Sequence, residues 1–258
     1  PHIWCAGCGH GIVLKSLLRT IDKKGISQDD TVMVSGIGCS SRTPGYVDIN
    51  TLHTTHGRAL AFATGVKMAN PDLKVIVITG DGDATAIGGN HFIHAARRNI
   101  DLTVLLYNNY IYGMTGGQCS PTTPKGAKAS TAQYGNLEPT FNISGLAKAA
   151  GAAFVARGDV YNVRKLDGLI EKAMDKKGFS LVEVVSPCPT AFGRRNKMAS
   201  PVKLMEQLRD SVVSVEKWAK MTDEERVGHF RTGVLQDIEK PEYTSEYAKF
   251  IAKLKAEK

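Results

Sequence analysis

Acidic and amide side chains follow two apolar runs of this chain of 258 residues, at positions where they could bind a cation. Gly80-Asp81-Gly82 follows the run 74–79, and Asn108-Asn109 follows the run 102–107. Because parallel strands end at one edge of a sheet, Asp81 and Asn109 are expected to converge. Their oxygens and the Ile111 carbonyl suit Mg²⁺ shared with a diphosphate. The alternative is two ordinary strand-end turns.

The chain also contains five cysteines, an odd number with uneven spacing that is a poor fit to a secreted disulfide framework. Cys5 and Cys8 form a C-x-x-C, and Cys39 and Cys188 each follow an apolar run, so all four map to the sheet edge of the acidic motif. Four thiolates at one site indicate zinc or an iron–sulfur cluster. One close pair joined by two distant cysteines favours the cluster, since structural zinc usually has two close pairs. Cys119 has no partner in this pattern.

The elements that must position these residues alternate between apolar strands and helices. Strands are expected at residues 31–35, 74–79, 102–107, 153–155 and 181–185, and helices at 11–21, 57–68, 90–98, 144–150 and 163–174. This alternation predicts an α/β fold with a mostly parallel central sheet flanked by helices, over residues 1–195. No strand pattern follows Phe192, so residues 196–258 are expected to form a helical or irregular extension that packs on this domain or on a partner.

Composition narrows the class of protein. Hydrophobic residues make up 42% and charged residues 22%, which is typical of a globular chain. The net charge of +8 is spread along the sequence, whereas a nucleic-acid footprint would cluster, so an acidic partner is favoured over nucleic acid. No apolar run is long enough to span a membrane and no signal segment is visible, so we expect a cytoplasmic protein.

Together these residues resemble one family, the beta subunits of 2-oxoacid:ferredoxin oxidoreductases. Gly80-Asp81-Gly82, its spacer and Asn108-Asn109 look like the thiamine-diphosphate motif, and residues 4–11, 36–40, 52–58 and 108–118 resemble family motifs in the family's order. The resemblance covers about residues 4–200. It implies the thiamine-diphosphate-binding fold, which agrees with the expected alternation of strands and helices.

The resemblance implies oxidative decarboxylation of a 2-oxoacid with thiamine diphosphate and Mg²⁺. Electrons would pass through one 4Fe–4S cluster to ferredoxin, an acidic partner, and coenzyme A would take the acyl group. By the family pattern, the cluster ligands are Cys5, Cys8, Cys39 and Cys188, and the Mg²⁺ ligands are Asp81, Asn109 and Ile111. The residues implied to line thiamine diphosphate are Ile37, Gly38, Cys39, Ser40, His56, Gly82, Asp83, Gly113 and Met114.

The same family pattern leaves catalysis and substrate choice partly outside this chain. No carboxylate that would activate the cofactor is evident here; the family's comes from the alpha subunit, which implies a hetero-oligomer of alpha–beta pairs that is inactive without alpha. His56 could instead be a structural histidine beside Arg58 that does not contact the cofactor. Arg42 could face a substrate carboxylate or be a solvated arginine. Gly116 stands where some relatives carry a lysine thought to serve coenzyme A.

Residues 41–46 look most like the 2-oxoglutarate branch of the family, while pyruvate and branched-chain 2-oxoacids stay open as substrates. Two other classes of protein also remain. A non-redox thiamine-diphosphate lyase would explain the acidic motif but not the four cysteines. A zinc-stabilised binding module or a pure electron carrier would explain the cysteines but not the acidic motif.

Overall fold

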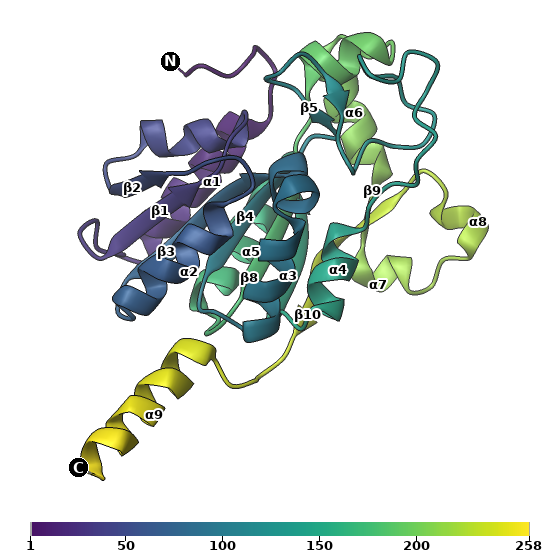
Figure 1. The fold of residues 1–258 in the computed structure, drawn as a ribbon. Helices are drawn as coiled ribbons and strands as arrows, with labels where there is room; N and C mark the ends of the chain where they lie inside the picture. Colours follow the sequence, from purple (N-terminus) through teal and green to yellow (C-terminus); the bar gives the residue numbers. More distant parts are fainter. Residues whose placement is uncertain (1, 258) are drawn as a thin grey trace.

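The computed structural model describes residues 2–257 and is organised around an eight-stranded sheet (Figure 1). Its strand order is β2-β1-β3-β4-β8-β7-β10-β9. The strands are β1 (Thr31–Ser35), β2 (Asn50–His53), β3 (Lys74–Gly80), β4 (Thr103–Asn108), β7 (Phe154–Asp159), β8 (Ser180–Val185), β9 (Val212–Ser214) and β10 (Phe230–Asp237). A separate two-stranded ribbon is formed by β5 (Ile111–Tyr112) and β6 (Gln118–Cys119).

The six strands from β2 to β7 in this order are parallel to their neighbours; the one antiparallel pair of this sheet within residues 2–257 is β7 with β10. This confirms the predicted mostly parallel sheet. Parallel sheets need both faces covered, which is why their strands are apolar on both sides. The burial of β4 and β8 follows that rule, because every residue of both strands is buried.

Helices cover the two faces of the sheet. The α-helices of residues 2–257 are α1 (His10–Lys23), α2 (Ala59–Ala69), α3 (Gly89–Arg98), α4 (Ile143–Ala149), α5 (Val163–Asp175), α6 (Pro201–Ser211), α7 (Val215–Trp218), α8 (Asp223–Arg226) and α9 (Tyr243–Ala256). Helices α2, α3 and α4 pack on one face, and α1 and α5 pack on the other (Figure 1). The five helices expected from the sequence are these five, with ends shifted by a few residues.

Alternating side chains divide the core into two layers. In β1, Val34 belongs to the layer under α2 and α3, while its neighbour Met33 belongs to the layer under α1 and α5. Val77 and Ile78 of β3 divide in the same way. The period of two places successive side chains on opposite faces. The core therefore fixes the register of the strands, and the register fixes which residues leave the sheet at its carboxyl edge.

The C-terminal extension departs from the prediction, because it contributes β9 and β10 to the main sheet. The expectation that no strand follows Phe192 is therefore wrong. Thr232 is the one buried residue of β10, so β10 lacks the apolar pattern of a core strand, and backbone pairing with β7 holds the strand in place. The predicted helical character holds for α6 to α9, and α9 extends away from the body (Figure 1). A boundary at residue 195 stays a prediction.

Neighbouring strands end together at one edge, as predicted from the alternation. Gly80 of β3 pairs with Tyr107 of β4, and Asn108 of β4 pairs with Val185 of β8. Ser35 at the end of β1 pairs with Ile78 of β3. The segments that follow these strands therefore leave the sheet side by side, and they carry the acidic, amide and cysteine motifs.

Candidate functional site

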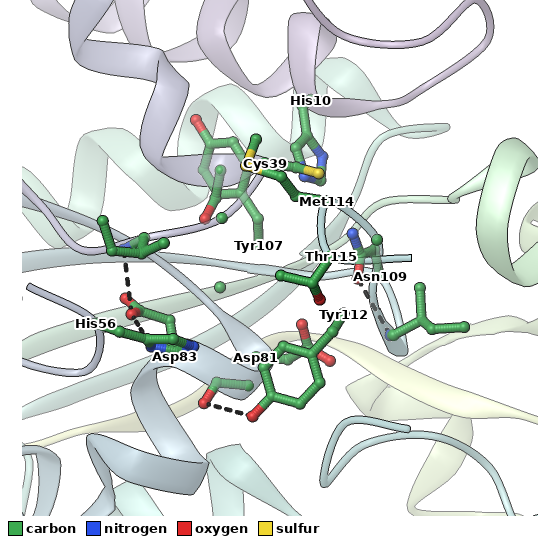
Figure 2. A pocket seen from close by; sticks show the side chains of 17 residues that line it. His10, Cys39, His56, Asp81, Asp83, Tyr107, Asn109, Tyr112, Met114 and Thr115 are labelled. Atoms are coloured by element: carbon green, nitrogen blue, oxygen red, sulfur yellow. Dashed lines mark hydrogen bonds and ion pairs between the residues drawn. The ribbon is translucent and has the colours of Figure 1, made fainter. Parts of the chain in front are cut away.

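A pocket lies at this carboxyl edge, and Figure 2 shows the side chains around it. It is lined by all nine residues expected beside thiamine diphosphate and by all three expected Mg²⁺ ligands. Further lining residues, to which the sequence analysis gave no role, are His10, Gly80, Tyr107, Tyr112 and Thr115. The loop after β1, the turn after β3 and the turn after β4 thus meet in one cavity.

Asp81 is the buried carboxylate of this pocket, with 4% of its surface exposed. The hydroxyls of Ser120 and Thr122 both donate to its Oδ2, each at 2.5 Å. Burial raises the pKa of Asp81 to about 6, and these hydrogen bonds oppose the rise. A cation bound nearby would stabilise the ionised form of this buried carboxylate, because an opposite charge favours ionisation.

Asn109 and Ile111 bring neutral oxygens to the same pocket, on either side of Tyr110. Tyr110 has φ of 65°, a left-handed conformation that costs a non-glycine residue about 1–2 kcal/mol. Tyr110 packs against Phe192, and its N–H donates to Asn108 Oδ1 at 3.2 Å. These contacts hold a turn that places the Asn109 amide and the Ile111 backbone along one pocket wall.

The oxygens of Asp81, Asn109 and Ile111 fit a magnesium ion by their chemistry. Hard cations prefer carboxylate, amide and backbone oxygens, and Mg²⁺ usually combines one or two carboxylates with substrate phosphates. Within residues 2–257, no three His, Cys, Asp or Glu side chains gather around one ion position. The predicted set contains a single carboxylate, so the remaining ligands of an ion here would come from amide, backbone and phosphate oxygens.

Asp83 lines the pocket, and its carboxylate also joins the loops after β1 and β2 to the end of β3. Oδ1 accepts from the Gly57 N–H at 2.7 Å and from the Ile37 N–H at 3.2 Å. Oδ2 accepts from the Thr79 hydroxyl at 2.7 Å, and His56 Nδ1 lies 2.8 Å from Oδ1. Figure 2 shows Asp83 and His56 together at one end of the pocket. Asp83 therefore holds the glycine-rich loop after β1 and the segment at Gly57, and His56 lies beside it.

Glycines permit the close approach of these segments. A Cβ on Gly36 would lie 2.0 Å from Asp83 Oδ2, and one on Gly82 would lie 2.2 Å from the Tyr112 ring. Neither position has room for a side chain. The Tyr112 hydroxyl also donates to the Gly82 carbonyl at 3.3 Å, so the ring covers this turn and closes one side of the pocket.

The cysteines Cys39 and Cys188 converge beside Gly113. A Cβ on Gly113 would lie 3.5 Å from the Cys39 Sγ and 3.6 Å from the Cys188 Sγ. Trp4, next to Cys5, donates its indole N–H to the Cys39 carbonyl at 2.7 Å, which ties the N-terminal segment to the loop after β1. Segments far apart in the sequence thus bring Cys188 close to Cys39, which lines the pocket.

The charges of the four cysteines act on one another's pKa values. Burial raises the pKa of Cys8 to about 12, and the charges of Cys188, Cys39 and Cys5 add to the rise. Burial likewise raises the pKa of Cys39 to about 11, with contributions from Cys188 and Cys5. Buried thiols of raised pKa are inert as nucleophiles, whereas a metal centre would deprotonate them. The arrangement therefore fits metal binding better than thiol catalysis.

Two other residues from the sequence analysis lie outside the pocket lining. Arg42 is exposed on the 3₁₀ helix η1 (Ser40–Tyr46), where its charge is close enough to lower the pKa of Cys39 slightly. Cys119 lies in β6, opposite Ile111, and its N–H donates to the Thr131 hydroxyl. The sulfur of Cys119 is not among the charges that affect Cys8 and Cys39.

His10, Ser120 and Thr122 are the main polar residues of the site that sequence reasoning missed. His10 is buried, its Nδ1 lies 2.9 Å from the Ser186 hydroxyl, and burial lowers its pKa to about 3. Its only sequence signal is its position directly after Cys8-Gly9. Ser120 and Thr122 lie in the long polar loop after β4, where no periodic pattern indicates the direction of a side chain.

Comparison with known proteins gives a consistent result. The family model described as thiamine pyrophosphate enzyme, C-terminal TPP binding domain, matches residues 36–184. A protein of Methanocaldococcus jannaschii named 2-oxoglutarate synthase subunit KorB is 53% identical over 257 residues, which is 100% of this chain and 95% of that protein. The 2-oxoacid:ferredoxin oxidoreductase subunit beta of Saccharolobus solfataricus is 46% identical over 72% of this chain and 62% of that protein.

A solved structure is also similar. The 2-oxoglutarate:ferredoxin oxidoreductase from Magnetococcus marinus, with 2-oxoglutarate, coenzyme A and succinyl-CoA bound, superposes with a TM-score of 0.88. The two chains are 36% identical, and the match covers 98% of this chain and 87% of that one. None of the helices between residues 2 and 257 combines the length and hydropathy needed to cross a membrane.

Proposed function

The chain belongs to the beta subunits of 2-oxoacid:ferredoxin oxidoreductases, and we propose that it binds thiamine diphosphate, Mg²⁺ and one 4Fe–4S cluster for the oxidative decarboxylation of 2-oxoglutarate. One observation carries the proposal: a single pocket joins the Asp81–Asn109 oxygens to the cysteine loop through Cys39 and Gly113. A thiamine lyase without redox function gives no reason for the cysteines, and a zinc module gives no reason for the acidic motif.

The residues of the pocket have distinct roles in this proposal. When bound, thiamine diphosphate would supply the electron sink for loss of carbon dioxide. Asp81, Asn109 and the Ile111 carbonyl would hold Mg²⁺, and the backbone of residues 80–82 would approach the diphosphate, as glycine-rich turns do. Asp83 keeps Ile37 and Gly57 in place. Cys5, Cys8, Cys39 and Cys188 would hold the cluster.

The proposal also includes a partner subunit, an electron acceptor and two substrates. The activating carboxylate is assigned to an alpha subunit, so the chain alone would be inactive, and ferredoxin would accept the electrons. The relative in Magnetococcus marinus has 2-oxoglutarate and coenzyme A bound, which supports both as substrates here. Arg42 is proposed to face the distal carboxylate, although it is exposed in this chain. The cytoplasm is the proposed location, since free thiols suit a reducing compartment.

The test is anaerobic purification of the full chain with metal and cofactor analysis. We expect about four irons and one thiamine diphosphate per chain. Cys188→Ser should lose most of the iron and its colour, while Cys119→Ser, the matched control, keeps both. Zinc in place of iron, or equal iron loss in both variants, would refute the cluster assignment. Co-production with the alpha subunit then allows 2-oxoglutarate, pyruvate and branched-chain 2-oxoacids to be compared by ferredoxin reduction.

A further inference from the structure

His10 has an unused hydrogen-bonding atom in the middle of this site. It is the first residue of α1, only 1% of its surface is exposed, and its Nε2 is buried without a partner in the part of the chain that the structure describes. Its ring lines the pocket, and Figure 2 shows it beside Cys39 and Met114, at the opposite end from His56. Buried polar atoms normally have a partner, so an unpaired one that lines a pocket points to a ligand.

The direction of the hydrogen bond with Ser186 decides which ring nitrogen of His10 carries the proton. A neutral imidazole has one donor and one acceptor nitrogen. The Ser186 hydroxyl lies 2.9 Å from Nδ1 and, within residues 2–257, has no other hydrogen-bond acceptor. If that hydroxyl donates to Nδ1, the ring proton is on Nε2. Gly9 permits the contact, because a Cβ there would lie 2.5 Å from the Ser186 Oγ. In that tautomer Nε2–H is a donor.

The residues that surround the His10 ring lie near Cys8 and Cys39. The His10 backbone N–H donates toward the Cys8 thiol. This contact lowers the pKa of Cys8 and so opposes the larger effect of burial. The ring packs edge-on against Tyr107 with centroids 5.0 Å apart and against Trp4 at 6.0 Å. Trp4 in turn donates to the Cys39 carbonyl. His10 thus contacts Trp4 and Cys8, which lie beside the loop of Cys39 and the C-x-x-C pair.

We propose that His10 Nε2–H donates a hydrogen bond to a sulfur of the cluster and thereby raises its reduction potential. The inference rests on the proposed function, since it requires the four cysteines to hold the cluster. Hydrogen bonds to cluster sulfurs are one of the means by which a protein sets a cluster's potential, and the residues that supply them tune the metal centre. A donor stabilises the more negative, reduced state, which fixes the sign of the effect. His10 is a positioning and tuning residue, not a catalytic one.

The experiment compares midpoint potentials of the full chain, purified anaerobically with its iron, by redox titration followed by electron paramagnetic resonance. His10→Phe keeps a planar ring but removes the donor, so its midpoint should move to a more negative value. His10→Gln restores an N–H donor and should recover part of that shift. His229→Phe, at an exposed site, is the matched control and should leave the midpoint unchanged. An exchangeable proton coupled to the reduced cluster should disappear in His10→Phe.

An unchanged midpoint in His10→Phe, with iron content retained, would overturn the proposal. So would an unchanged midpoint together with weaker thiamine diphosphate binding, because Nε2 would then serve the other end of the pocket. If His10→Phe fails to assemble, Ser186→Ala decides: it keeps the ring but removes the group that fixes the proton on Nε2, and it should give a smaller negative shift. A wild-type chain that binds no cluster would contradict the proposed function, not the role of His10 alone.

Discussion

Replacing Asp81 by asparagine should stabilise the ligand-free chain while it weakens the Mg²⁺ site. Burial raises the pKa of Asp81 from 3.8 to about 6, so ionisation of this carboxyl is unfavourable in the folded chain. At 1.36 kcal/mol per pH unit, this difference corresponds to about 3 kcal/mol when the group is fully ionised in both states. Asparagine keeps the shape and can still accept hydrogen bonds from Ser120 and Thr122, but it carries no charge.

The pH dependence follows from the direction of the pKa shift. Between pH 3.8 and about 6 the folded chain binds more protons at Asp81 than the unfolded chain does, so this group's contribution to stability falls as pH rises. Below pH 3.8 the carboxyl is protonated in both states and the cost of ionisation is absent. Asp81→Asn should therefore equal wild type near pH 4 and exceed it by up to about 3 kcal/mol at pH 8.

Urea unfolding at both pH values, without added Mg²⁺ or thiamine diphosphate, measures this difference. Asp72→Asn, an exposed aspartate, is the matched control and should show no such change. Adding Mg²⁺ and thiamine diphosphate at about 100 times the Kd should stabilise wild type by about 2.7 kcal/mol and the Asp81→Asn variant far less. A variant less stable than wild type at pH 8, or a pH-independent difference, would refute the reasoning.

Two further variants test the support of the pocket by urea unfolding. Gly36→Ala places a Cβ 2.0 Å from Asp83 Oδ2 and should lower the free energy of unfolding by about 1–3 kcal/mol. Gly65→Ala, the control, has open space around its Cβ and should not destabilise the chain. Equal effects of the two variants would contradict the close contact at Gly36. Arg157→Met removes the ion pair of buried Glu183 and should lower the free energy of unfolding by about 3–5 kcal/mol. A loss below about 1 kcal/mol would show that buried Glu183 does not need this ion pair.

The sequence predicted the strands that are buried on both faces and missed those that are not. β3 and β4 are apolar runs whose burial requires a central position in a parallel sheet. β2 is largely exposed at the edge of the sheet, and β10 is mostly half-buried. Pairing with a neighbour, not a local apolar pattern, makes these two segments strands, and such pairing cannot be seen in a single stretch of sequence.

The residues of the site also separate into those that the sequence could place and those that it could not. Asp81 and Asn109 could be placed together because each directly follows a strand, and parallel strands end at one edge. Ser120 and Thr122 could not be placed, because their segment folds back from an irregular loop to reach Asp81. Asp83 was expected at the cofactor, but its bonds to loops from other parts of the chain depend on the complete tertiary structure.

The position of β10 has a consequence for the order in which the chain folds. β7 ends at Asp159 and pairs with β8 on one side, but its other side is covered only by β10, which begins at Phe230. During synthesis from the N-terminus, an apolar strand edge therefore stays uncovered after the ligands of the pocket have emerged. Such edges promote association between nascent chains. The C-terminal segment, which carries none of the proposed cofactor ligands, can cover this edge only after residues 230–237 have been synthesised, so the edge is open to such association until then.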